Sequence, residues 1–301
     1  MNEIKNVLVV GSGTMGRGIA QSFLRGGHRV TVLSRDPAKV SGLPSEARLV
    51  GEPPDQAPDL ILETVVEDLD VKTALYARLE SAYGGGPILG TNTSGLSLDA
   101  LAGGLDHPRR FIGIHYFQPA EALPLVEVIR TTATTDEVFA AVAASLGRNG
   151  QRVLEVRKPV KGFLANRLQH AILHEAFSLI EAGVATAEDV DNFAKYLFGP
   201  RLSVTGLIEQ KDISGLNVTA KTQLNLVPDL DHSALPARVI LDKVEAGEDV
   251  LITRRGRPVA HLSPATTPKK PLRPLAEFRE RMPRWRRPSA VLLREERDEG
   301  L

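Results

Sequence analysis

The chain of 301 residues contains no cysteine. This absence excludes disulfide bonds, cysteine thiolate nucleophiles and cysteine-based zinc sites, and we expect no metal site. No apolar run approaches the ~18–20 residues needed to cross a bilayer. The first residues, Met1–Lys5, carry no basic region followed by a long apolar stretch, so we expect no signal peptide and a cytoplasmic protein.

Charges balance overall but not along the chain. Basic and acidic residues both number 37, which gives no reason to expect nucleic acid or a membrane as a partner. Residues 1–231 nevertheless carry a net charge of −5 and residues 232–301 one of +5, which indicates that the end of the chain differs in function. The length predicts about two domains, and 42% hydrophobic residues suffice for their cores.

Short apolar runs alternate with helical stretches in the first half of the chain. The expected strands are Asn6–Val10, Arg29–Leu33, Asp59–Val66, Pro87–Gly90, Phe111–His115, Leu125–Ile129 and Val153–Val156. Helical patterns lie between several of them, as at Asp70–Ala82 and Asp136–Leu146. This alternation predicts an α/β fold, a doubly wound parallel sheet with helices on both faces, over residues 1–158.

The pattern changes twice after this region. Two long helical stretches, Phe163–Ala182 and Ala187–Leu197, predict a smaller all-α domain over residues 159–231. A short α+β or extended tail is expected over residues 232–301. It comprises a helix at Ala237–Glu245, strands at Val250–Thr253 and Val259–Leu262, and the proline-rich segment Pro264–Pro274.

A glycine pattern follows the first expected strand. Gly11, Ser12, Gly13, Thr14, Met15 and Gly16 fit G-x-G-x-x-G. Because the pattern follows a strand and opens a helix, we interpret it as the dinucleotide-binding loop of a Rossmann fold rather than as a turn without a ligand. The helix N-terminus would then face the pyrophosphate, and all six residues become candidate cofactor contacts.

The end of the second strand bears on the choice between NAD and NADP. An acidic residue at this position would bind the ribose hydroxyls of NAD, but the sequence has Ser34 followed by Arg35. A hydroxyl and a guanidinium suit a 2′-phosphate, which favours NADP. The alternatives are that Asp36 takes the acidic role or that Arg35 is only a solvated charge.

A histidine and a glutamate stand out in two later strands. His115 ends an expected strand at the sheet edge where ligands bind in open α/β folds. Glu127 interrupts an apolar strand, and a buried glutamate requires a partner. Paired with Glu127, His115 would act as a general base for a hydroxyl proton. The alternatives are a structural ion pair and an exposed edge strand.

Four separated motifs carry a family resemblance over about residues 5–230. GSGTMG, NTSGLSL, RFIGIHYFQPAEALPLVEVI and GFLANRLQHAILHEAFSLIEAGVATAEDVD together resemble the L-3-hydroxyacyl-CoA dehydrogenase family. The resemblance implies a dehydrogenase with a helical domain that contributes to a homodimer. It makes His115 the base, Glu127 its orienting carboxylate, Ser94 a contact of the reacting oxygen and Asn166 a substrate contact. The same resemblance assigns cofactor contacts to Glu67, Lys72, Ser94 and Gln118, of which Gln118 stands where the family has asparagine.

Two segments of this sequence differ from the family's pattern and leave alternatives open. The resemblance predicts a 3-hydroxyacyl-CoA as the substrate. The segment Pro37–Pro58 is short, whereas acyl-CoA members have a helical hairpin there, so the alternative is a free hydroxy acid, as for the family's gulonate dehydrogenase relatives. Residues 237–264 resemble Phd/YefM-type antitoxins in place of the family's last helices, and Pro274–Leu301 resembles their toxin-binding arm. The competing hypothesis is an impaired enzyme whose tail binds a toxin-like protein. We interpret Arg254, Arg255 and Arg257 as a solvated basic turn, and the alternative is that they contact DNA.

Overall fold

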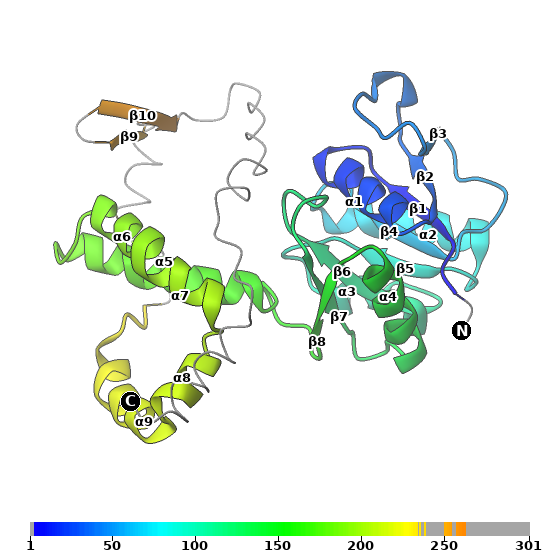
Figure 1. Ribbon diagram of the computed structural model, residues 1–301. Helices are drawn as coiled ribbons and strands as arrows, with labels where there is room; N and C mark the ends of the chain where they lie inside the picture. The colour runs from blue at the N-terminus through cyan, green and yellow to red at the C-terminus, as the bar shows by residue number, and fades with distance from the viewer. Residues whose placement is uncertain (1–2, 234, 236–237, 239–249, 255–256, 263–301) are drawn as a thin grey trace, which may run out of the picture. The chain divides into compact units, whose positions relative to one another are not determined.

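The computed structural model describes residues 3–233, 235, 238, 250–254 and 257–262 (Figure 1). The chain divides into two compact units, Met1–Gln169 and His170–Leu301. The segment Pro264–Pro274, the toxin-binding arm and, except for Arg238, the predicted helix Ala237–Glu245 lie outside the described residues.

The first unit is built on a sheet of eight strands in the order β3-β2-β1-β4-β5-β6-β7-β8. The strands are β1 (Asn6–Val10), β2 (Arg29–Leu33), β3 (Arg48–Val50), β4 (Leu60–Glu63), β5 (Ile88–Thr91), β6 (Phe111–Tyr116), β7 (Leu125–Ile129) and β8 (Arg152–Val156). All neighbours pair in parallel except β6 and β7. The predicted Rossmann-type α/β fold is therefore confirmed.

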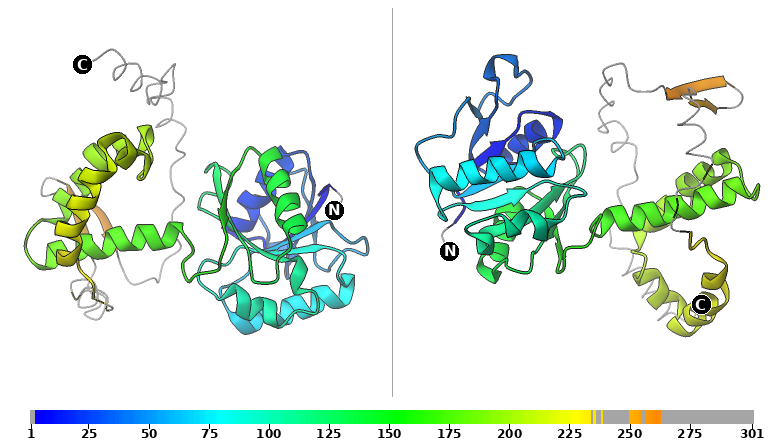
Figure 2. Two further views of the ribbon diagram at one scale, coloured as in Figure 1. Left: turned by 90° about the horizontal axis from the view of Figure 1, so that it is seen from below. Right: turned by 180° about the vertical axis from the view of Figure 1, so that it is seen from behind.

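Helices cover both faces of this sheet. They are α1 (Thr14–Arg25), α2 (Leu69–Tyr83), α3 (Leu98–Gly103) and α4 (Asp136–Arg148). α1 and α4 pack on one face and α2 and α3 on the other, as opposite views show (Figures 1 and 2). The central strands are buried on both faces, which explains why their sequences are continuous apolar runs without alternation.

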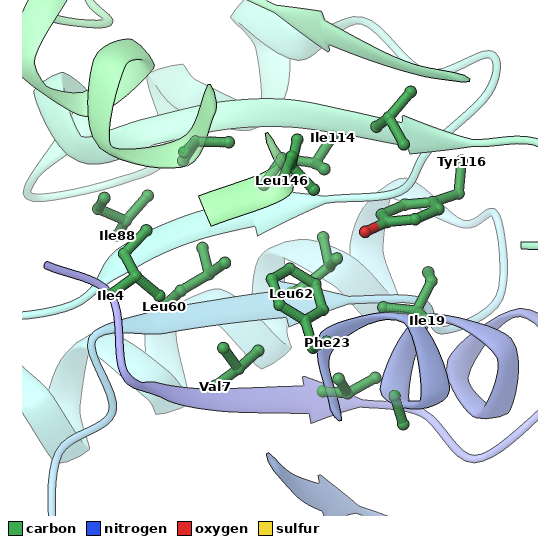
Figure 3. Packing of buried hydrophobic residues seen from close by; sticks show 14 of the residues in the cluster. Ile4, Val7, Ile19, Phe23, Leu60, Leu62, Ile88, Ile114, Tyr116 and Leu146 are labelled. Atoms are coloured by element: carbon green, nitrogen blue, oxygen red, sulfur yellow. The ribbon is translucent and has the colours of Figure 1, made fainter. Parts of the chain in front are cut away.

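The core on the α1 side illustrates this packing. Phe23 and Ile19 of α1 are fully buried against Leu62 of β4, and Tyr116 of β6 closes the cluster near the carboxyl ends of the strands (Figure 3). Burying side chains of this size stabilises the fold by about 1.5–3 kcal/mol each. This core fixes the strand ends on which the candidate site is built.

The antiparallel pairing of β6 with β7 departs from the predicted all-parallel sheet. The link between these strands, Phe117–Pro124, is shorter than the dozen or so residues that a parallel crossover requires. The chain therefore turns back directly, and the resulting register places His115 opposite Glu127.

Two short elements were not expected from the sequence. β3 has three residues, and α3 has six, so neither is long enough for a periodic pattern to develop. The remainder of Pro37–Pro58 contains one 3-10 turn, Pro37–Lys39, and no helical hairpin is present in this fully described segment.

The second unit contains helices followed by a hairpin. The elements are α5 (Ala165–Glu181), which begins in the first unit, α6 (Ala187–Phe193), a π-helical turn (Ala194–Phe198), α7 (Gly199–Val204), α8 (Glu209–Ser214), α9 (Leu216–Leu226), β9 (Val250–Arg254) and β10 (Arg257–Leu262). The two strands predicted in the tail are present as β9 and β10, which pair antiparallel. α7, α8 and α9 lie beyond Leu197, where the second helical stretch predicted from the sequence ends.

Candidate active site

The glycine loop joins β1 to α1 in a conformation that its glycines permit. Gly11 has φ +116°, a value that disfavours any residue with a Cβ, and that Cβ would lie 2.6 Å from Oγ1 of Thr64. A Cβ on Gly16 would lie 1.9 Å from the carbonyl oxygen of Gly11, so only glycine allows this close packing of helix and loop. A Cβ on Gly13 would meet nothing within 4 Å, which leaves open space beside the loop.

The first turn of α1 fits a dinucleotide phosphate. No side chain caps this helix and no acidic residue lies in its first turn. In contrast, Asp68, Ser97 and Thr135 cap α2, α3 and α4. An uncapped N-terminus beside an open glycine offers free backbone N–H donors to an anion. Of the other loop residues, Thr14 is exposed, Ser12 is half-buried, and Met15 packs against the core.

The end of β2 lies next to the glycine loop. The hydroxyl of Ser12 donates to that of Ser34 over 3.0 Å, and Ser34 is buried. Arg35 is exposed, whereas Asp36 pairs with Lys39 at 2.7 Å. Because the Asp36–Lys39 pair is exposed, it does not exclude Asp36 from the acidic role, and both predicted alternatives at the end of β2 remain.

His115 and Glu127 form a buried pair on β6 and β7. Nδ1 of His115 lies 2.7 Å from Oε2 of Glu127, and both side chains are at most 7% exposed. The rings of Phe117 and Phe163 lie against the imidazole, with centroids at 4.8 Å and 5.5 Å. The predicted partner of the buried glutamate is therefore the histidine, and the alternative of an exposed edge strand is wrong because β8 covers β7.

The second oxygen of Glu127 is held by the start of α5. Oε1 accepts hydrogen bonds from the backbone amides of Leu164 (3.0 Å) and Ala165 (2.8 Å). Burial by itself would raise the pKa of the Glu127 carboxyl, but the hydrogen bonds from His115 and the two amides outweigh burial and hold that pKa below its ordinary value. Glu127 is therefore a carboxylate that only accepts hydrogen bonds.

This arrangement fixes the tautomer of the histidine. Because the carboxylate has no proton to donate, Nδ1 of His115 carries the hydrogen that joins the pair. In the neutral ring, Nε2 then keeps its lone pair. The imidazole is thus oriented to accept a proton at Nε2, as a general base requires.

The turn before α5 was not singled out from the sequence. Gly162 and Phe163 both have positive φ, +78° and +49°. For phenylalanine this conformation is strained, and such strain concentrates at functional sites. It turns the next two amides towards Glu127 while the buried Phe163 ring packs on His115. Nothing in an amino-acid pattern reveals a positive φ at a non-glycine residue.

A second cluster lies after β5 and contains Ser94. Oε1 of Glu67 accepts hydrogen bonds from the amides of Ser94 and Gly95, both at 2.9 Å, and from the hydroxyl of Thr93 at 2.5 Å. The structure therefore brings two predicted residues, Glu67 and Ser94, together. Burial would raise the pKa of the Glu67 carboxyl, but the Thr93 hydroxyl, the two amides and nearby Lys72 hold it below its ordinary value.

Three further predicted residues lie on α2, in the first turn of α5 and after β6. Lys72 is 1% exposed and pairs with two glutamates. Asn166 is half-buried in the first turn of α5, and Gln118 is exposed after β6. Asn92, to which sequence reasoning gave no role, accepts a hydrogen bond from the Tyr116 amide at 2.8 Å and so ties the Ser94 turn to the end of β6.

Two negative findings apply to the described part of the chain. Among these residues, no group of three or more histidines and acidic side chains could hold a metal ion. No helix within the same residues is long and apolar enough to span a membrane.

Two family models match the chain. One, described as "3-hydroxyacyl-CoA dehydrogenase, NAD binding domain", matches residues 6–49 and 55–159. The other, "3-hydroxyacyl-CoA dehydrogenase, C-terminal domain", matches residues 162–250. The second match extends beyond the region over which the four motifs were recognised.

Individual proteins show the same similarity. An L-carnitine dehydrogenase of Pseudomonas aeruginosa is 31% identical over 280 residues, covering 82% of this chain and 86% of the relative. The human mitochondrial hydroxyacyl-coenzyme A dehydrogenase is 30% identical over 248 residues, covering 72% and 78%. The crystal structure of a 5-formyl-3-hydroxy-2-methylpyridine 4-carboxylic acid 5-dehydrogenase, an NAD⁺-dependent dismutase, matches with a TM-score of 0.77 at 26% identity and covers 99% of each chain.

Proposed function

The chain belongs to the 3-hydroxyacyl-CoA dehydrogenase family of NAD-binding oxidoreductases, and we propose that it oxidises a secondary hydroxyl group on a small, free hydroxy acid. The observation that carries this proposal is the buried pair of His115 and Glu127 at the carboxyl edge of the Rossmann-type sheet. A base at this edge lies where open α/β sheets bind their ligands.

His115 acts as the general base in this proposal. Its Nε2 atom takes the proton of the substrate hydroxyl, and Glu127 stabilises the imidazolium that forms. Ser94, from the turn after β5, donates a hydrogen bond to the reacting oxygen, and Asn166 contacts the substrate. The nicotinamide, when bound, supplies the acceptor for the hydride that leaves the same carbon.

The glycine loop would hold the cofactor. The uncapped first turn of α1 and the open face of Gly13 suit the pyrophosphate, with Ser12, Thr14 and Met15 beside it. Glu67 would contact the cofactor from the Ser94 turn. NAD is the cofactor of the family, and preference for NADP through Ser34 and Arg35 is a further proposal.

A free acid is favoured over a coenzyme A thioester by the segment between β2 and β4. The helical hairpin expected of acyl-CoA members is not present there, and a 3-10 turn and the three residues of β3 take its place. Two of the similar proteins, the L-carnitine and the pyridine carboxylate dehydrogenases, are named for small carboxylates. The coenzyme A thioester is the second candidate, because both matching family models carry that name.

We also propose that the second unit forms a homodimer. Its described helices bury little of their apolar surface, since many large apolar side chains are exposed. Examples at 47–80% exposure are Ile172, Phe193, Tyr196, Leu216, Val218 and Leu224. A second copy of the same helices would cover such a surface. A toxin-like partner for the tail stays a prediction of the sequence.

Reduced nicotinamide absorbance tests the function. The wild type is offered L-carnitine, 3-hydroxybutyrate and 3-hydroxybutyryl-CoA, each with NAD and with NADP. Turnover with a free acid that is lost in His115→Ala but kept in His107→Ala, a matched exposed histidine, supports the proposal. Turnover with the thioester alone would move the assignment to the second candidate. No turnover with a wider panel of either class would refute the dehydrogenase.

A further inference from the structure

A buried carboxylate that has no place in the proposed chemistry lies beneath the Ser94 turn. Glu63 ends β4 and is 0% exposed. Four donors reach it: Nζ of Lys72 and the Val65 amide at Oε1, both at 2.6 Å, and the hydroxyls of Tyr76 (2.7 Å) and Thr91 (2.8 Å) at Oε2. An ionised carboxylate has about four acceptor sites, so those of Glu63 are filled.

Lys72 connects this carboxylate to a second one. Its side chain is 1% exposed, and its Nζ atom lies 2.6 Å from Glu63 and 3.6 Å from Oε2 of Glu67. A lysine this deeply buried is stable only with charged partners. The family resemblance had assigned Lys72 a cofactor contact, but its donors are directed at these two glutamates. Its charge therefore acts through Glu67.

Glu67 is in turn the acceptor for an exposed segment of backbone. Ser94 and Gly95 are both exposed, and their amides donate to the same Oε1 atom, at 2.9 Å each. Neither amide donates to another acceptor within the described residues. The position of this turn, and with it the Ser94 hydroxyl, thus depends on where the Glu67 carboxylate is held.

From these contacts we propose that Glu63 is a positioning residue: through Lys72 it holds Glu67 on the amides of Ser94 and Gly95 and so places the Ser94 hydroxyl. Glu63 touches neither substrate nor cofactor. The negative Glu63 attracts the positive Lys72, and Lys72 in turn attracts the negative Glu67. Of the three, only Glu67 is exposed at the surface, with 39% of its side chain accessible. The lowered pKa of Glu67, to which Lys72 contributes, is consistent with a carboxylate that stays charged here.

The inference rests on the proposed role of Ser94, but its test needs neither substrate nor cofactor. The test is amide hydrogen exchange at Ser94 and Gly95 in the full-length protein, measured by NMR. The variant Glu63→Gln/Lys72→Met removes both buried charges together and avoids leaving one unpaired. We expect these two amides to exchange about 10-fold faster than in the wild type, because a carboxylate no longer attracted by Lys72 leaves the turn. The Thr64 amide, bonded to the Val10 carbonyl, should be unchanged.

A second variant and a control complete the amide-exchange experiment. In Glu67→Gln the Glu63–Lys72 pair is intact, and the same 10-fold acceleration is expected because the attraction between charges is lost. Glu155→Gln/Arg130→Met neutralises another ion pair of the same unit, outside this cluster, and should leave both amides protected. Unchanged protection in either Glu63→Gln/Lys72→Met or Glu67→Gln would overturn the proposal and make the network purely structural.

Activity provides a second readout once a substrate is known. Because displacement of a reacting group by a fraction of an ångström reduces turnover, we expect kcat of Glu63→Gln/Lys72→Met to fall about 10–100-fold. The melting temperature should stay close to that of the wild type. If the network were purely structural, the variant with its unchanged melting temperature would keep the kcat of the wild type, and that result would count against the proposal. Failure of every substrate would count against the function only, since the exchange result stands independently.

Discussion

His115 and Glu127 face each other across an antiparallel strand pair, with Nδ1 2.7 Å from Oε2 and the other carboxylate oxygen bonded to two amides at the start of α5. One carboxylate therefore joins the candidate base on β6 to the chain that leaves the Rossmann-type sheet. Changes at Glu127 should affect both the orientation of the imidazole and the placement of α5's first turn.

Glu127→Gln should lower kcat by about 10²-fold or more. The amide can present its NH₂ group to Nδ1, which would favour the tautomer with hydrogen on Nε2, where the substrate proton must be accepted. Steady-state kinetics with a substrate identified by the turnover assay measures this. Glu155→Gln, a carboxylate on neighbouring β8, is the matched control and should keep kcat within about twofold. Equal kcat for both variants would show that Glu127 does not orient the base.

Acid should destabilise the protein partly through Glu127. Its pKa is lower in the folded chain than the ordinary 4.5, so its contribution to the free energy of unfolding is present above about pH 4.5 and is lost as pH falls through the folded-state pKa. Urea denaturation between pH 3 and 7 measures this: as pH falls, the free energy of unfolding should decrease less for Glu127→Gln than for the wild type. Parallel curves for the two proteins would contradict the lowered pKa.

Arg35→Ala should change cofactor preference. If Ser34 and Arg35 bind a 2′-phosphate, KM for NADP should rise about 10-fold while KM for NAD changes less than about twofold, because only NADP loses a charge-assisted hydrogen bond. Initial rates with both cofactors provide the measurement. Lys39→Ala, a neighbouring exposed cation, is the control. An equal effect on both cofactors would assign Arg35 to the solvated surface.

Gly162→Ala should destabilise the protein by about 1–2 kcal/mol, because its φ of +78° disfavours a Cβ. It should also reduce kcat, since the displaced turn no longer directs two amides at Glu127. Gly147→Ala is the opposite control: this glycine is exposed within α4, its Cβ would meet nothing within 4 Å, and alanine should stabilise the helix by about 0.5–1 kcal/mol. If thermal denaturation gave Gly162→Ala a melting temperature equal to or above that of the wild type, the turn at Gly162 would not be strained by a Cβ.

Sequence patterns predicted those strands and site residues that the local amino-acid sequence determines. Apolar runs gave β1, β2 and β7 with bounds close to those observed, because strands buried on both faces must be apolar throughout. The glycine loop was recognisable because only glycine fits its turn and its close contacts. Glu127 stood out because a carboxylate inside an apolar strand requires a partner.

Other features depend on contacts between segments distant in the chain. The antiparallel turn of β7, which brings Glu127 opposite His115, follows from a link too short for a crossover, and the pairing itself exists only in the sheet. The burial of Lys72 is likewise a tertiary property, since a lysine in a helix is ordinarily solvated. The sequence by itself thus determined the fold class, the cofactor loop and the catalytic candidates. Tertiary structure alone decided which carboxylate each candidate meets, because hydrogen bonds and ion pairs form only where packing removes water and fixes the partners.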